Sequence, residues 1–129
     1  MPMTINIGLF FLRFIPSVIL IINHGWPKLL QYQSFASTFP DPLGLGNSFS
    51  LTLAIIAEVL AAFFVLIGFF TRVSALLVFI TMLVAFGIVH GSDIFEKREL
   101  AALYGLIYFV ILIVGPGGWS FDFKQGRRF

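Results

Sequence analysis

Residues 51–72 read LTLAIIAEVLAAFFVLIGFFTR, and this stretch decides the class of protein. It is an apolar run of roughly 20 residues, which is long enough to cross a bilayer as one α-helix. Its single acidic residue, Glu58, stands about a third of the way along the run. A carboxylate at that depth is costly unless it is paired, protonated or hydrated. Glu58 is therefore a candidate functional residue.

Glu58 is predicted to face other helices and not lipid. Ala54, Ala61 and Ala62 stand four residues before it and three and four residues after it, so they share its helical face. Small residues on one face allow membrane helices to approach closely. The stretch therefore predicts a helix bundle with an acid in its interior.

The composition of the whole chain agrees with this class. Its 129 residues suffice for one domain and are 59% hydrophobic and 11% charged, with a mean hydropathy of +1.01. These values are typical of a membrane protein. The net charge is only +2 and the basic residues are scattered, so nucleic-acid binding has no support. The absence of cysteine excludes dithiol chemistry, iron–sulfur ligation and disulfides within this chain.

Three further apolar segments complete the prediction of an all-α membrane protein, a four-transmembrane-helix bundle in a single domain, residues 1–129. The helices are expected at about residues 5–26, 51–70, 73–90 and 97–114. Residues 27–50 are rich in proline, glycine and aromatic side chains, which is typical of a loop at the membrane interface. The N-terminus has no basic start and no cleavage site, so we expect the first helix to be retained.

An even number of spans places both termini on one side of the membrane. The side of the termini carries four basic residues: Arg72, Lys124, Arg127 and Arg128. The other side carries three basic residues: Lys28, Lys97 and Arg98. The positive-inside rule therefore predicts cytoplasmic termini, by a margin of four against three.

The polar residues of the first helix indicate a pocket inside the bundle. Arg13, His24 and Lys28 belong to a stripe at helical period, which is expected to face the interior or a wet cavity. In this topology His24 and His90 lie near the outer surface, and Glu58 lies roughly 10 Å below it. We predict that Arg13 pairs with Glu58, directly or through water or a ligand. The predicted outward-opening pocket comprises Arg13, His24, Glu58 and His90, with Lys28 and Glu99 at its mouth and Tyr104 and Tyr108 in its wall.

Short motifs follow one another in a fixed order along nearly the whole chain. They are Arg13, His24–Gly25, Lys28, PDPLGLG at 40–46, Glu58, GFFTR at 68–72, His90, Glu99 within KRELAALY, and Gly115–Pro116–Gly117 followed by Ser120 and Asp122. This ordered set resembles the DoxX family of small four-helix membrane proteins. The resemblance implies a multi-pass protein of the bacterial inner (cytoplasmic) membrane.

The resemblance implies less about activity. Members of the family include membrane subunits of thiosulfate:quinone oxidoreductase and of a mycobacterial membrane-associated oxidoreductase complex. More distant eukaryotic relatives act as cargo receptors or assembly chaperones. Because the family spans redox and non-redox roles, membership alone does not select one.

Two functions are therefore carried forward. The first is an integral subunit of a redox-associated, quinone-linked inner-membrane complex, whose pocket holds a quinone head group. Arg and His side chains would donate to the quinone oxygens, and Glu58 would relay protons. The alternative is a non-catalytic scaffold, assembly or binding subunit of a membrane protein complex. In that case Arg13 and Glu58 would only fix the helix register, and the tyrosines would only fill the core.

The remaining expectations concern ligands and partners. His24 and His90 are too few for a closed zinc site and the resemblance does not support haem, so we predict no metal site. No cofactor is identified, and a quinone is the candidate. The expected partners are the lipid bilayer and either other membrane or periplasmic subunits or a second copy of the chain. No residue pattern identifies a reaction, so the sequence leaves open whether the protein is an enzyme.

Overall fold

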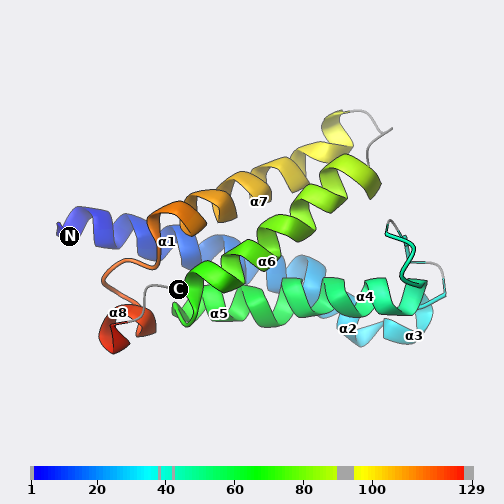
Figure 1. The fold of residues 1–129 in the computed structure, drawn as a ribbon, viewed down its shortest axis with the longest axis horizontal. Helices are drawn as coiled ribbons and strands as arrows, with labels where there is room; N and C mark the ends of the chain where they lie inside the picture. The colour runs from blue at the N-terminus through cyan, green and yellow to red at the C-terminus, as the bar shows by residue number, and fades with distance from the viewer. Residues whose placement is uncertain (1, 38, 42, 90–94, 127–129) are drawn as a thin grey trace.

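The fold was determined as a computed structural model, which describes residues 2–37, 39–41, 43–89 and 95–126. Within these ranges every regular element is a helix, and there is no strand. The helices join into four long rods that run broadly along one axis, with two short helices outside them (Figure 1). The prediction of an all-helical chain is confirmed for the residues described.

Each of the first three rods contains a π-helical segment, labelled η. The first rod consists of α1 (Met3–Leu20), η1 (Ile21–Gly25) and α2 (Trp26–Leu30). The second consists of α4 (Asn47–Ile55), η2 (Ile56–Ala61) and α5 (Ala62–Ile67). The third consists of α6 (Thr71–Val84) and η3 (Ala85–Val89), and the fourth is α7 (Phe95–Val114). The two short helices are α3 (Tyr32–Phe35) and α8 (Phe121–Gln125).

The first rod is longer than the sequence predicted. It continues past residue 26 to Leu30, although Pro27 lacks a backbone N–H donor. Pro27 stands in the first turn of α2, directly after η1, where the hydrogen bonding changes from π to α. The rod is continuous there, so Pro27 leaves its hydrogen-bond ladder one N–H short, and the adjoining π-helical turn is a point at which a helix accommodates such a break. Lys28 therefore lies on the helix and not in the following loop.

The second rod begins and ends at glycines with a positive φ. Gly46 has a φ of 104° and precedes Asn47, which starts the rod earlier than the predicted residue 51. Gly68 has a φ of 75° and ends the rod after Ile67, earlier than the predicted residue 70. Only glycine adopts such backbone angles without strain, so these two residues set the length of the rod.

Small side chains bring the rods together in the interior. Ala61 and Ala62 of the second rod are buried, as predicted, against Ala75 and Val78 of α6. The core continues along α7 through Tyr104, Tyr108 and Ile111. Small residues permit the close backbone approach that membrane helices need for packing. This core determines how the polar side chains of different rods are brought together.

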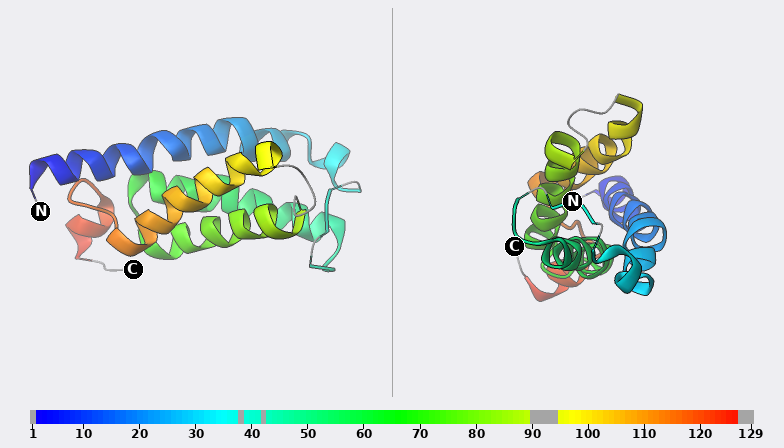
Figure 2. Two further views of the ribbon diagram at one scale, coloured as in Figure 1. Left: turned by 90° about the horizontal axis from the view of Figure 1, so that it is seen from above. Right: turned by 90° about the vertical axis from the view of Figure 1, so that its right-hand side faces the viewer.

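Large apolar side chains cover much of the outer surface of the rods. Leucine, isoleucine and phenylalanine side chains are exposed along all four of them. The rods Met3–Leu30 and Asn47–Ile67 are long and apolar enough to cross a bilayer, and Thr71–Gly87 is a shorter apolar helix. The start of α1 and the helix α8 lie toward one end of the molecule, and α2, α3 and the start of α4 lie toward the other (Figures 1 and 2).

Candidate functional site

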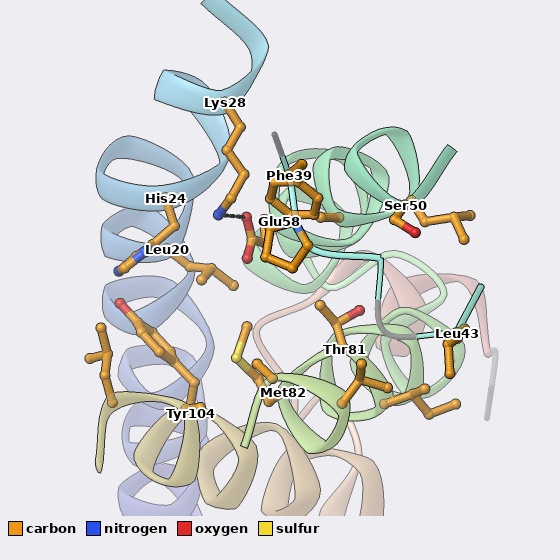
Figure 3. Close-up of a pocket in the computed structure, with 18 of the residues that line it drawn as sticks. Leu20, His24, Lys28, Phe39, Leu43, Ser50, Glu58, Thr81, Met82 and Tyr104 are labelled. Atoms are coloured by element: carbon orange, nitrogen blue, oxygen red, sulfur yellow. Dashed lines mark hydrogen bonds and ion pairs between the residues drawn. The ribbon is translucent and has the colours of Figure 1, made fainter. Parts of the chain in front are cut away.

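A cavity of about 400 Å³ lies between the rods, at the end of the molecule away from α8. Its walls come from the first rod, from α4 and η2, from α6 and η3, and from the beginning of α7 (Figure 3). The lining is mainly apolar. Six lining residues carry polar side chains: His24, Lys28, Ser50, Glu58, Thr81 and Tyr104.

Lys28 and Glu58 form an ion pair in the cavity wall. The Nζ atom of Lys28 donates a hydrogen bond of 2.6 Å to Oε2 of Glu58. The Lys28 side chain is 22% exposed and the Glu58 side chain is 9% exposed, so the pair is largely withdrawn from the surface. Pairing neutralises the two charges, which lowers the cost of holding the carboxylate among apolar side chains.

His24 and Tyr104 complete the polar end of the cavity. Their rings meet edge to face, with centroids 5.8 Å apart. Figure 3 shows both side chains on the same side of the cavity as Lys28 and Glu58, whereas Leu43 lies at the opposite side. The cavity therefore has a polar end beside Lys28 and Glu58. Toward its other end, here called the apolar end, the polar side chains are Ser50 and Thr81, whose hydroxyl groups already donate to Asp41 and to the carbonyl oxygen of Leu77.

Three π-helical segments each contribute a residue to the cavity wall. His24 lies in η1, Glu58 in η2 and the lining residue Ala85 in η3. A π-helical turn widens the helix, and such turns occur frequently at functional sites. Gly25 brings η1 and η2 into contact, since a Cβ atom added there would stand 2.8 Å from the backbone oxygen of Glu58. Only a glycine at this position allows so close an approach.

The loop before α4 forms the outer wall of the cavity through Phe39, Pro40, Leu43 and Leu45. Asp41 organises this loop. Its carboxylate accepts hydrogen bonds of 2.9 Å from the backbone N–H groups of Leu45 and Gly46, and one of 3.0 Å from the Ser50 hydroxyl. These hydrogen bonds, led by the one from Gly46, hold the pKa of Asp41 below its usual value.

Arg13 does not pair with Glu58, and the predicted pair is wrong. The guanidinium group of Arg13 is buried at the other end of the molecule. It donates hydrogen bonds of 3.0 Å to the carbonyl oxygens of Val65 and Leu66, and a further one to the carbonyl oxygen of Trp119. Carbonyl groups in the last turn of a helix have no partner within the helix, so they offer a cation a ready set of acceptors.

Asp122 lies at the same end of the molecule as the Arg13 guanidinium group, where the rods meet α8. Its carboxylate accepts hydrogen bonds from the backbone N–H groups of Phe70, at 2.8 Å, and Thr71, at 2.7 Å, at the start of α6. Its own N–H donates to the carbonyl oxygen of Gly68, at 2.7 Å. Arg13 and Asp122 therefore belong to a connection that holds α5, α6 and the C-terminal segment together.

The other predicted site residues are divided between the cavity and its surroundings. The structure brings four of them together in the cavity wall: His24, Lys28, Glu58 and Tyr104. Tyr108 lies in the core, where its hydroxyl group and that of Ser17 are 2.8 Å apart. Glu99 is exposed and does not line the cavity. His90 lies outside the residues that the structure describes.

Sequence reasoning missed Ser50, Thr81 and the loop residues that close the cavity. Thr81 carries no sequence signal. A threonine in a helix can donate to a backbone carbonyl of its own helix, as the Thr81 hydroxyl group does to that of Leu77. The loop did carry a signal, since an Asp–Pro pair followed by glycines favours a tight turn. Over the described ranges, no group of three or more His, Cys, Asp and Glu side chains could hold a metal ion.

Comparison with known proteins assigns the family. The DoxX family model matches residues 8–91, which is more than half of the chain. The chain belongs to the DoxX family. It is a membrane protein with apolar helices, in agreement with the exposed apolar surface of the rods.

One similar curated protein comes from Haemophilus influenzae (strain ATCC 51907 / DSM 11121 / KW20 / Rd). It is 28% identical over 132 aligned residues, which cover 92% of this DoxX protein and 93% of the relative. The name of that relative is "Uncharacterized protein", so it assigns no activity. No solved structure matches the chain.

Proposed function

We propose that this DoxX protein binds a small amphipathic molecule in its cavity as a membrane subunit of a redox-associated complex of the bacterial inner membrane. A lipid quinone is the candidate ligand. The observation that carries the proposal is the Lys28–Glu58 pair at one end of a largely apolar cavity. Ionisable groups held deep in a membrane protein are usually functional. A cavity of about 400 Å³ is also within the range of small-molecule sites.

The proposal includes a topology. Four spanning helices with cytoplasmic termini would place the cavity near the outer surface of the membrane. The shared location of the start of α1 and of α8 supports termini on one side. The basic residues favour the cytoplasm for that side, by four against three.

The polar end suits a head group that both donates and accepts hydrogen bonds. Lys28 has further N–H groups and Glu58 has a second carboxylate oxygen, so the pair can bind a head group without separating. Lys28 would donate to a quinone oxygen, and Glu58 would accept a proton from the hydroxyl group of a hydroquinone. Oxidation of the hydroquinone to the quinone would release two protons, one to Glu58 and one to water, and its two electrons would pass to a partner subunit of the complex.

Native mass spectrometry tests this proposal. The wild-type protein, purified in mild detergent, is expected to retain a small molecule that solvent extraction identifies as a lipid quinone. Glu58→Gln removes the negative charge of Glu58 while keeping the shape of the side chain, and it leaves Lys28 without a carboxylate partner, so this variant is expected to lose the molecule. The matched control is Glu99→Gln, since Glu99 is exposed and does not line the cavity.

The same spectra contain the opposing result. A wild-type protein that carries no small molecule and instead retains a second protein chain would contradict ligand binding. That result would support the non-catalytic scaffold or assembly subunit.

A further inference from the structure

The second and third rods diverge on either side of the cavity. α6 packs against α5 and η2, but its later half separates from α4, so the two helices form a fork (Figure 1). Ala54 lines the cavity from the α4 side of the fork, and Thr81 lines it from the α6 side. The cavity reaches into this fork, which is bordered by α4, by α6 and by the loop residues Phe39, Pro40, Leu43 and Leu45.

The rim of this fork carries apolar side chains that are also exposed. Leu53 on α4 and Ile80 on α6 both line the cavity, and they are 42% and 47% exposed. In a membrane protein, exposed apolar side chains on the sides of helices face lipid. The apolar end of the cavity therefore connects to the hydrocarbon region of the bilayer.

The polar end of the cavity, beside Lys28 and Glu58, has little net charge. Lys28 and Glu58 cancel one another, so the end has hydrogen-bonding groups with little net charge. Among the described lining residues Lys28 is the lone lysine or arginine, and it is already paired. An anionic phospholipid head group would need an unpaired cation, whereas an uncharged polar ring needs only hydrogen-bond partners.

We infer that the fork between α4 and α6 is a lateral portal for a lipid-phase ligand with an apolar chain and an uncharged head group. The head group lies beside Lys28 and Glu58, and the apolar chain lies in the fork between Ala54 and Thr81 and continues into lipid. This inference rests on the proposed function. It adds the route of entry, the orientation of the ligand and the residues that select for a chain.

Two quinone probes and a blocked portal test the inference. The probes are decylubiquinone and its ring analogue without a chain, and binding is measured in lipid nanodiscs, with empty nanodiscs correcting for partition. Ala54→Trp and, as a second variant, Thr81→Trp fill the fork from its two sides. Leu60→Trp and Leu76→Trp are the controls, because both leucines are exposed and lie outside the cavity wall.

After the correction for partition, wild-type protein is expected to bind decylubiquinone severalfold more tightly than the ring analogue, because the chain adds packing contacts with the walls of the fork to the contacts of the ring. The portal variants are expected to lower the affinity for decylubiquinone by a larger factor than the affinity for the ring analogue, so that the advantage of the chain is lost. The control variants are expected to behave as the wild type.

Two other outcomes separate the inference from the proposed function. Equal binding of both probes, unchanged in the portal variants, would overturn the portal and leave the cavity as a quinone site. No binding of either probe to the wild-type protein would overturn quinone binding itself, and the inference with it.

Discussion

Gly25 of η1 lies directly against the backbone of Glu58 in η2. A Cβ atom at Gly25 would stand 2.8 Å from the carbonyl oxygen of Glu58 and 2.6 Å from Cγ2 of Val59. Real Cβ atoms do not approach backbone atoms so closely, so any side chain would force the two rods apart. The Glu58 carboxylate therefore owes its position beside Lys28 to a glycine on the first rod.

Gly25→Ala is accordingly expected to destabilise the protein by roughly 1–3 kcal/mol, the usual cost of overpacking a close contact. The measurement is the thermal unfolding midpoint in detergent. Gly8→Ala is the control, because an added Cβ at Gly8 in α1 meets no atom within 4 Å. Alanine favours helix over glycine, so Gly8→Ala should be neutral or slightly stabilising. Equal midpoints for the two variants would show that the contact between η1 and η2 is not needed for stability.

The Lys28–Glu58 pair predicts a coupled response to mutation. Lys28→Met leaves a poorly solvated carboxylate and Glu58→Leu leaves a poorly solvated ammonium group, and each is expected to cost about 2 kcal/mol. The double variant has neither charge and should be more stable than either single variant. Thermal unfolding of the four proteins in a double-mutant cycle measures the coupling. Additive losses would mean that the two side chains do not depend on one another.

The hydrogen bonds that Asp122 accepts predict a structural role at the start of α6. Asp122→Ala would leave the backbone N–H groups of Phe70 and Thr71 without the carboxylate that they now share. The expected loss is about 2 kcal/mol or more, because the groups are withdrawn from water and lie at a helix N-terminus. Gln125→Ala, at an exposed position in α8, serves as the control in the same thermal measurement. A midpoint unchanged by Asp122→Ala would contradict this role.

The hydrogen bonds that Asp41 accepts predict that the stability of the loop before α4 depends on pH. The pKa of Asp41 is lowered in the folded protein, mainly by the hydrogen bond from the Gly46 N–H. A lowered folded-state pKa adds stability that is present above the unfolded-state pKa, about 3.9, and is lost as pH falls through the folded value. Amide hydrogen exchange at Leu45 and Gly46 should be slower in wild type than in Asp41→Asn at neutral pH. The difference should shrink as the pH falls below the unfolded-state pKa and the Asp41 carboxylate becomes protonated. A difference that persists at low pH would exclude the Asp41 carboxylate as its cause.

Much of the site follows from periodicity, and part of it does not. His24, Lys28 and Glu58 were placed in a pocket because a helical stripe and an intramembrane acid indicate the interior, and the structure brings these residues together. The partner of Glu58 could not be derived in this way. If the first helix ended before Pro27, Lys28 would lie in a loop. Arg13 would then be the cation of the first helix within reach of Glu58. The π-helical turn before Pro27 keeps Lys28 on the helix at the level of Glu58.

The sequence by itself determined the class of the protein, the helical character of its rods and the face of the second rod that turns inward. These properties depend on hydrophobicity and on the 3.6-residue period, which are local and can be counted along the chain. Tertiary structure alone decided which cation meets Glu58, where Arg13 finds acceptors and that a fork opens between α4 and α6. These depend on the relative register and crossing of rods far apart in the chain. Register is set by close contacts such as that of Gly25 with Glu58, and no local pattern encodes such a contact.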